Sequence, residues 1–538
     1  MLPASFTNSE TQIDVLKPEK IEGVGKNDRE VSIENLKLNP EKPFEFAAIR
    51  SVDFTEEDGQ WLKFSGGWLW RLRIQAPGAK SISLLFSKII VPRDSQLWVY
   101  SLDASSIQGP FILRGRSSGH LKTPVVLGDD VTVELFIPQE ILGLEEVRIS
   151  LNRVNPAFFD LFGDDSALPL HYCHIDVNCE EGTLYSDQIR SVVLIELDGY
   201  KVGTGTLLNN AKHDGLPYII TANHLGIDKY NDDKVNFYWN HQSSRCGLRF
   251  GSASENTSGS TFLAGSRDSD FCLLRADSIP DPEFNVYYSG WDATGKVVTD
   301  VTSIHHPLGQ VKAIKSSRGP IRSTKLLKDE SDTNGEFWRV PGWKNGANED
   351  FSSGSGLWSS HKKLFIGQNY GGFSTCEDKT EPDWYGKFSE SYKKISYWLD
   401  PDSKNINTLG GFDPEKRTKT YHKLKGAKVL ESEKALFAHV HLIKKAHLNE
   451  LNGLNKEKIK PFQKEIKDGK ILQEISVSEE GAKEMARKMK ENFRGPKVLT
   501  LLPDSKSPKN YLATEESLNI DFSESPDKLS EELDSFLI

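Results

Sequence analysis

Apolar and polar residues alternate along several short segments of this chain, and this period of two constrains its fold most. The pattern is clearest in three N-terminal segments, Trp68–Ile74, Val131–Ile137 and Val147–Leu151. Such alternation is typical of strands that bury one face. Turn formers such as Ala76-Pro77-Gly78-Ala79 separate the segments. Many short strands at this spacing predict an antiparallel β-sandwich over residues 41–153.

A second β-rich region is expected over residues 173–402, after a linker at 154–172. Its strand-like segments include Ser191–Ile195, Tyr218–Thr221 and Leu364–Gly367. The region has Gly-rich turns and little helical periodicity, which predicts a pair of all-β barrels. The linker is recognised by composition, because it is rich in Pro, Gly, Asn and Asp.

The two ends of the chain differ from these β regions. Residues 1–40 are polar and mixed in charge, and we expect a loosely ordered lead-in there. From 403 to 538 Lys and Glu are dense and cysteine is absent, which indicates a charged extension of unknown role. Within it, Ser476–Glu479 has the pattern of a capping box, and apolar residues up to Phe493 follow at helical spacing. The expected fold class is therefore mainly β, with a partly helical C-terminal segment.

Length and charge exclude several classes of function. The chain has 538 residues, room for about three domains. A formal charge of -10 and a pI near 5.8 argue against a binder of nucleic acid or anionic membranes. No apolar run approaches the ~18 residues that a membrane span needs. Residues Met1–Asn8 lack the basic and apolar regions of a signal peptide, so a removed leader, unconventional export and an internal location all stay open here.

One turn has the composition of a nucleophile loop. Residues Asp350–Trp358 place serines and glycines between two apolar segments. Glycines beside a serine allow a sharp bend that exposes a hydroxyl and aims backbone N–H groups at one point. By itself this pattern is more typical of an ordinary loop, since turns favour Ser and Gly.

Two further residues complete a catalytic pattern. His224 directly follows an apolar strand, and Asp270 directly precedes the apolar segment Phe271–Leu274. Taken alone, His224 is better explained as a core histidine and Asp270 as a turn aspartate. The chain order His, Asp, Ser within one β region is that of the chymotrypsin type of serine protease.

The same region resembles the lysyl endopeptidase family of secreted bacterial serine proteases, which have the trypsin-like fold. The matching segments follow one another in order from 173 to 395: Cys173–Cys179, Thr204–Asn210, Thr221–His224, Phe237–Trp239, Cys246, Ser269–Phe271, Tyr288–Asp292, Ile304–Pro307, Ser352–Ser355, Ile366–Gln368, Gly371-Gly372 and Asp383–Lys387. The N-terminal β region also resembles the propeptide-like domain that precedes such proteases.

The resemblance implies a role for each site residue. His224 would be the general base, Asp270 would orient it, and Ser353 would be the nucleophile. Asp268 is a nearby competitor for the orienting role, but Asp270 directly precedes the strand and matches the motif. The backbone N–H groups of Phe351 and Ser353 would form the oxyanion hole.

The resemblance also implies a primary specificity pocket. Asp383 would lie at its base, where a buried carboxylate favours a substrate that brings a cation. The compact ammonium of lysine suits such a pocket better than the planar fork of arginine. Gly371 and Gly372 would form the open backbone wall along which the substrate lies.

The cysteines are consistent with export. By resemblance, Cys173 would pair with Cys376 and Cys179 with Cys246, while a third family bridge, near Gly203 and Leu225, lacks both partners. Cys272 would then be a buried free thiol. No Cys/His cluster has the spacing of a zinc site, so neither a metal nor another cofactor is expected. We read His305 and His306 as structural, because the pattern offers them no serine partner.

Three departures from the family leave other interpretations open. Phe351 replaces a glycine of the oxyanion turn, Gly356 replaces a proline, and Tyr370 replaces a histidine before the glycine pair. We expect a secreted or periplasmic, monomeric serine endopeptidase that cleaves proteins or peptides after lysine through an acyl-enzyme. One alternative is an impaired homologue that binds peptides or partners. Another is a sugar- or surface-binding sandwich with the barrels as scaffold. Arg153 is the nearest candidate for processing before the protease region.

Overall fold

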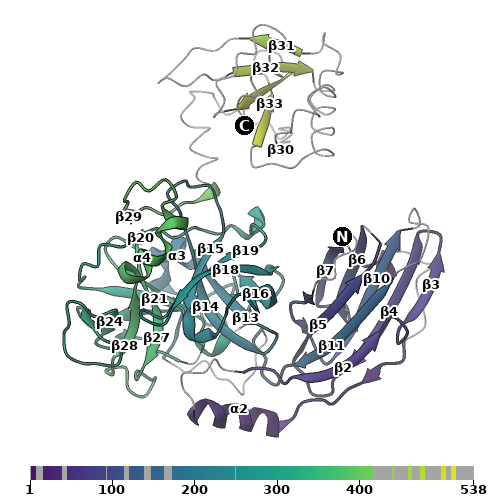
Figure 1. Cartoon of the computed structure of the whole chain (residues 1–538), viewed down its shortest axis with the longest axis horizontal. Helices are drawn as coiled ribbons and strands as arrows, with labels where there is room; N and C mark the ends of the chain where they lie inside the picture. Colours follow the sequence, from purple (N-terminus) through teal and green to yellow (C-terminus); the bar gives the residue numbers. More distant parts are fainter. Residues whose placement is uncertain are drawn as a thin grey trace. The chain divides into compact units, whose positions relative to one another are not determined.

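The structure is a computed structural model of the whole chain (Figure 1). It describes residues 2–7, 16–38, 45–92, 94–113, 120–138, 147–162, 173–248, 250–349 and 351–415, and the strands that lie between 439 and 515. The chain divides into two compact units, Met1–Thr418 and Lys419–Ile538. In the described part, no helix is both long and apolar enough to cross a membrane.

The lead-in is more ordered than its composition predicts. It contains α1 (Ala4–Thr7), β1 (Glu19–Lys20) and the 13-residue helix α2 (Lys26–Leu38). Asp28 in the first turn of α2 accepts the N–H of Gly25 at 3.0 Å and pairs with Arg50 at 2.9 Å. The expectation of loose order was wrong for these residues, because contacts with distant residues rather than a strong apolar stripe hold the helix.

The N-terminal region is a sandwich of two sheets (Figure 1). The first sheet has the order β1-β4-β10-β6-β7, with β3 beside β4, and the second has the order β2-β11-β5-β8, with β9 beside β5. The strands are β2 (Arg50–Thr55), β3 (Gln60–Phe64), β4 (Gly67–Gln75), β5 (Ser81–Ile90), β6 (Ser95–Ser101), β7 (Ile107–Leu113), β8 (Leu121–Lys122), β9 (Val126–Leu127), β10 (Asp130–Pro138) and β11 (Arg148–Pro156). Leu72 and Val133 from the first sheet and Phe86 and Leu151 from the second belong to one buried core.

The expected linker does not begin at 154. Strand β11 continues to Pro156, and the residues after it are buried rather than exposed. Phe159, Leu161 and Phe162 pack into an apolar cluster with residues of both neighbouring regions. The composition was misleading because this segment combines turn formers with aromatics; residues 163–172 lie outside the described part.

The second β region consists of two sheets that form the paired barrels. The first barrel has the order β17-β16-β13-β14-β15-β19-β18. Its strands are β13 (Val192–Leu197), β14 (Lys201–Leu208), β15 (Tyr218–Ala222), β16 (Val235–Trp239), β17 (Asn256–Ser258), β18 (Ser260–Ser266) and β19 (Phe271–Ala276). Ile220 from this barrel and Ile304 and Phe365 from the second share one core, which joins the two barrels.

The second barrel follows the path β12-β22-β21-β26-β27-β28-β24-β23, with β20, β25 and β29 attached beside it. Its strands are β12 (Ile175–Asp176), β20 (Trp291–Asp292), β21 (Val301–His305), β22 (Ala313–Ser317), β23 (Arg322–Thr324), β24 (Phe337–Val340), β25 (Trp343–Asn345), β26 (Gly356–Ser359), β27 (Phe365–Gly372), β28 (Asp383–Lys387) and β29 (Thr408–Leu409). The helical elements of this region are η2 (Glu180–Tyr185), α3 (Ser186–Ser191), η3 (Asn223–Leu225), η4 (Asp232–Lys234), η5 (Pro282–Phe284), η6 (Pro307–Gly309) and α4 (Phe388–Leu399). Because β29 pairs with β20, this packing extends past the expected limit at 402.

Buried polar contacts join the sandwich to the first barrel. Lys122 on β8 and Glu196 on β13 form an ion pair at 3.2 Å, and both side chains are almost fully buried. The Arg153 guanidinium pairs with Asp198 and also donates to its carbonyl at 2.9 Å. Arg153 therefore lies within a strand and is held by an ion pair, which is a poor setting for proteolytic processing.

The second unit contains a five-stranded antiparallel sheet of order β30-β33-β34-β32-β31. Its strands are β30 (His439–His441), β31 (Ile459–Phe462), β32 (Gln473–Ser478), β33 (Val498–Pro503) and β34 (Asn510–Glu515). The expected helix start at Ser476 was wrong, because Ser476–Ser478 belong to β32 and pair with β31 and β34. The body of that helix, up to Phe493, lies outside the described residues.

Candidate active site

The turn before β26 lies between the two barrels and is hydrogen-bonded to both. The Ser353 carbonyl accepts the N–H of Thr204 on β14 at 2.9 Å, and the Gly354 N–H donates to Asn369 on β27 at 2.8 Å. Gly354 has a φ of +83°, and a Cβ there would lie 2.1 Å from Thr221 Oγ1. Only glycine fits this position, so the sequence fixes where the chain turns.

His224 and Asp270 meet because their strands are paired. His224 follows β15 within η3, Asp270 precedes β19, and the register pairs Ala222 with Phe271. Asp270 Oδ1 accepts the backbone N–H of His224 at 2.9 Å, and Oδ2 lies 2.7 Å from His224 Nδ1. The carboxylate thus contacts both the backbone and the ring, which fixes the orientation of the imidazole.

Ser353 closes the arrangement on the other side of the ring. Its Oγ lies 2.7 Å from His224 Nε2. Ser353 is half-buried, whereas Ser352 and Ser355 have no exposed surface. Asp268, the competing carboxylate, is exposed and pairs with Lys394 at 2.6 Å, away from His224. Ser353 is therefore the serine of this turn that both contacts an oriented histidine and reaches solvent.

Asp383 begins β28 and is fully buried. Its Oδ2 accepts hydrogen bonds from Trp343 Nε1 at 2.6 Å and Ser374 Oγ at 2.7 Å, and its Oδ1 accepts the Ser374 N–H at 3.3 Å. Burial raises the pKa of Asp383, while Lys315 and these donors act in the opposite direction. No local sequence pattern pointed to Trp343, Ser374 or Lys315 at this site.

Residues 170–386 match the family model described as lysyl endopeptidase, C-terminal domain. This region belongs to a trypsin-like serine protease family.

Solved structures similar to the chain include three proteases or protease-related domains. Deg5 is 17% identical, with 42% of this chain and 95% of that chain covered and a TM-score of 0.27. The MamO protease domain from Magnetospirillum magneticum is 10% identical, with 39% and 97% covered and a TM-score of 0.26. The thermostable serine protease AL20 from an extremophilic microorganism is 10% identical, with 39% and 97% covered and a TM-score of 0.28.

Phe351 lies in the turn before β26 with a φ of +70°, a region that residues other than glycine rarely adopt. Its ring is buried with Phe46, Phe162 and Tyr238 in the cluster between the sandwich and the first barrel. Its carbonyl accepts the Thr204 hydroxyl at 3.0 Å. Burial of this ring explains why a residue other than glycine is tolerated at this position. The Ser353 N–H has no acceptor among the residues that the structure describes.

A second serine–histidine contact joins the turn before β26 to β21. Ser352 Oγ is 2.7 Å from His305 Nδ1, so the interpretation that His305 has no serine partner was wrong. Both residues are fully buried, and burial holds the pKa of His305 well below its usual range. His306 Nδ1 instead contacts the carbonyl of Gln310 at 2.8 Å. Without solvent access, the Ser352–His305 pair is structural.

The two adjacent glycines at the end of β27 have different surroundings. A Cβ at Gly371 would meet no atom within 4 Å, whereas a Cβ at Gly372 would lie 2.2 Å from Asp383 Oδ1. Gly371 thus leaves space open, and Gly372 lets the strand lie directly against the Asp383 carboxylate. Tyr370, before this pair, contacts the His224 ring with centroids 5.3 Å apart.

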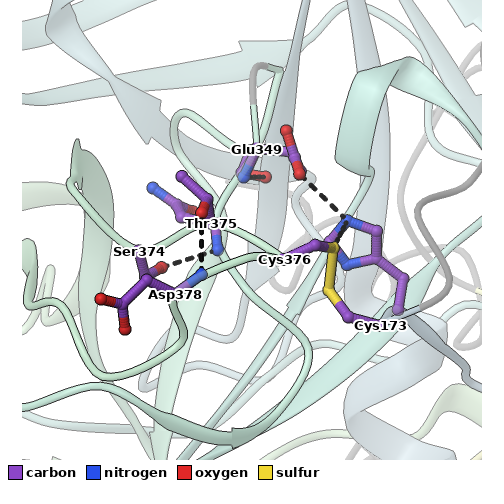
Figure 2. The surroundings of a disulfide bond; sticks show 9 residues. Cys173, Glu349, Ser374, Thr375, Cys376 and Asp378 are labelled. Carbon is purple, nitrogen blue, oxygen red and sulfur yellow. Dashed lines mark hydrogen bonds and ion pairs between the residues drawn. A yellow bond between two sulfur atoms is a disulfide. The ribbon is translucent and has the colours of Figure 1, made fainter.

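The protease region contains the two disulfides expected from the resemblance, Cys173–Cys376 and Cys179–Cys246. Figure 2 shows the first, with the Glu349 carboxylate nearby; its Oε1 lies 3.8 Å from His174 Nε2. Cys173, His174 and Cys376 lie close enough to resemble a metal site, but their sulfurs are bonded to each other and are not free thiolates.

The remaining cysteine and the missing bridge also have structural explanations. Cys272 is free and fully buried, and burial raises the pKa of its thiol. Where the family has a third bridge, Leu225 packs over Gly203, and a Cβ there would lie 2.5 Å from Leu225 Cδ1. The Leu225 side chain, in η3 after β15, therefore packs against β14 at that point.

Proposed function

We propose that the protein is a serine endopeptidase that cleaves peptide bonds through an acyl-enzyme intermediate. The observation that carries the proposal is the continuous hydrogen-bonded sequence Asp270–His224–Ser353, with 2.7 Å at each side-chain contact. In this arrangement a base contacts the hydroxyl and a carboxylate orients the base, which are the requirements for activating a serine.

Each residue then has one role in the reaction. His224 Nε2 takes the Ser353 proton as Oγ attacks the peptide carbonyl, and it returns that proton to the departing amine. The N–H groups of Ser353 and Phe351 stabilise the oxyanion. A water molecule, deprotonated by His224 in the same way, releases the acyl group. Asp270 keeps Nδ1 protonated and stabilises the imidazolium.

A preference for lysine before the scissile bond is the finer part of the proposal. Asp383 supports it, because a fully buried carboxylate gains most from a cation that arrives with the substrate. The two disulfides support an extracellular or periplasmic location, since such bridges persist in oxidising compartments. We further propose that the sandwich remains bound to the barrels during catalysis, joined by the Lys122–Glu196 pair.

The test is hydrolysis of matched peptide amides with lysine, arginine or norleucine before the scissile bond. We expect the purified full chain to hydrolyse them and Ser353→Ala to be inactive. Ser352→Ala is the matched control, because Ser352 lies next in the chain but contacts His305 instead of His224. Equal hydrolysis by wild type and Ser353→Ala would overturn the proposal. Peptide binding without cleavage would favour an impaired, peptide-binding homologue.

A further inference from the structure

A lysine of the protein itself lies close to the buried Asp383 carboxylate. Lys315 on β22 is fully buried. Its Nζ donates to Asn348 Oδ1 at 2.9 Å and lies 4.4 Å from the centre of the Trp343 ring. A buried ammonium requires a counter-charge or it loses its proton.

Two short routes connect this ammonium to Asp383. Trp343, whose ring face contacts Lys315, donates its Nε1–H to Asp383 Oδ2 at 2.6 Å. Asn348, which accepts from Lys315, donates its N–H to Ser374 Oγ at 2.9 Å, and Ser374 Oγ donates to the same carboxylate oxygen at 2.7 Å. Within the described residues no direct ion pair joins Lys315 to Asp383. The two charges therefore interact through space, with Trp343 between them.

We propose that Lys315 is a specificity-determining residue, an internal cation that competes with a substrate lysine for the charge of Asp383. This inference rests on the proposed function and refines its lysine preference. A protonated Lys315 balances Asp383 before substrate arrives and places a like charge close to an incoming ammonium. The preference of the pocket for lysine is then weak. A neutral Lys315 leaves Asp383 unbalanced, and the pocket favours lysine.

The charge state of Lys315 depends on its surroundings. Burial lowers the pKa of Lys315 to about 8, and the carboxylates of Asp383 and Glu349 oppose this shift. His305 on the adjacent strand also faces this group, but burial keeps its pKa well below the usual range and the ring neutral. Lys315 thus loses its proton near pH 8, whereas a substrate lysine stays charged until about pH 10.4.

Lys312 on the same polypeptide segment provides a matched control. It is also a fully buried lysine, but its Nζ donates to the Ile189 carbonyl at 2.9 Å. Asp383 is not among the groups that act on its pKa, which burial lowers to about 7. Loss of Lys312 removes a buried ammonium of the same kind without changing the charge around Asp383.

The experiment measures the ratio of kcat/KM for lysine to kcat/KM for norleucine in otherwise identical peptide amides. Any pH dependence of the catalytic step that the two peptides share cancels in the ratio. We expect Lys315→Met to raise this ratio roughly ten- to hundredfold near pH 7, since like charges in a desolvated site strongly repel. Asn348 Oδ1 keeps a hydrogen bond from Asn369 Nδ2 in this variant. Lys312→Met should leave the ratio unchanged, and adding Asp383→Asn to Lys315→Met should remove the gain.

A second measurement needs no variant. In the wild type the ratio should rise roughly tenfold between about pH 7 and about pH 9.5, as Lys315 loses its proton. An unchanged ratio in either measurement, with peptides still cleaved, would overturn this inference alone. Labelling by a serine-reactive fluorophosphonate reports the proposed function independently of the pocket. Absence of both labelling and cleavage would overturn the proposed function and this inference with it.

Discussion

The Tyr370 ring lies edge-on against the His224 imidazole, with ring centroids 5.3 Å apart and planes inclined by 66°. Tyr370 also contacts Phe337 at 6.0 Å, which holds its ring in place. The imidazole is thus positioned from two sides, by Asp270 at Nδ1 and by Tyr370 at the ring. This gives Tyr370 a positioning role that its sequence position alone did not reveal.

Replacing Tyr370 should therefore weaken catalysis moderately. Tyr370→Ala should lower kcat/KM by roughly 2- to 12-fold, because an aromatic pair contributes about 0.5–1.5 kcal/mol. Tyr370→Phe keeps the ring and should stay within about twofold of wild type. The comparison uses steady-state hydrolysis of one peptide amide. Equal losses in both variants would show that the hydroxyl, rather than the ring contact, matters.

Phe351→Gly should cost stability more than turnover. Losing the buried ring costs about 3–5 kcal/mol, while relief of the left-handed backbone returns about 1–2 kcal/mol. We expect the free energy of unfolding to fall by about 1–4 kcal/mol in denaturant titrations. The N–H at 351 remains, so kcat should change by less than about tenfold. A more stable variant would contradict the account of the Phe351 cluster.

The Cys179–Cys246 bridge should contribute measurably to stability. It spans a sequence separation of 67 residues, so it restricts the unfolded chain. Replacing both cysteines by serine should lower the free energy of unfolding by about 2–4 kcal/mol. Denaturant titration under non-reducing conditions measures this directly. A loss below about 0.5 kcal/mol would mean that the bridge hardly constrains the unfolded chain.

Cys272 should be unreactive in the folded protein. Burial raises the pKa of its thiol, and the thiolate is the reactive form. The neutral thiol is the form that folding favours. The stability that the neutral Cys272 thiol gives the folded protein is complete below the pKa of the thiol in the unfolded chain, near 8.5. It falls as the pH rises above that value. Iodoacetamide near pH 8 should modify one cysteine after unfolding and none before; fast labelling of native protein would contradict this.

The sequence allowed the main site residues to be predicted because each stands at the end of an apolar strand. Pairing of β15 with β19 brings His224 and Asp270 together, and Gly354 fixes the turn that presents Ser353. These features are local, because each lies at the end of one strand-like segment. They can therefore be recognised from the pattern and spacing of residues in the sequence.

Other features depend on contacts between distant residues, which no local pattern reveals. Helix α2 is held by Arg50, 22 residues after Asp28, and Ser352 meets His305 across 47 residues. Lys315 gave little signal, because a lysine in a strand is ordinarily read as exposed. Its burial follows from the packing of β22, β25 and β28 around Asp383.

Active-site labelling tests the central claim most directly. Wild-type protein is treated with a fluorophosphonate, and the adduct is located by mass spectrometry of the digested protein. We predict one adduct, on Ser353, which persists in Ser352→Ala and is lost in both Ser353→Ala and His224→Ala. An adduct on another residue, or none on the wild type, would contradict the assignment of Ser353 as a nucleophile activated by His224.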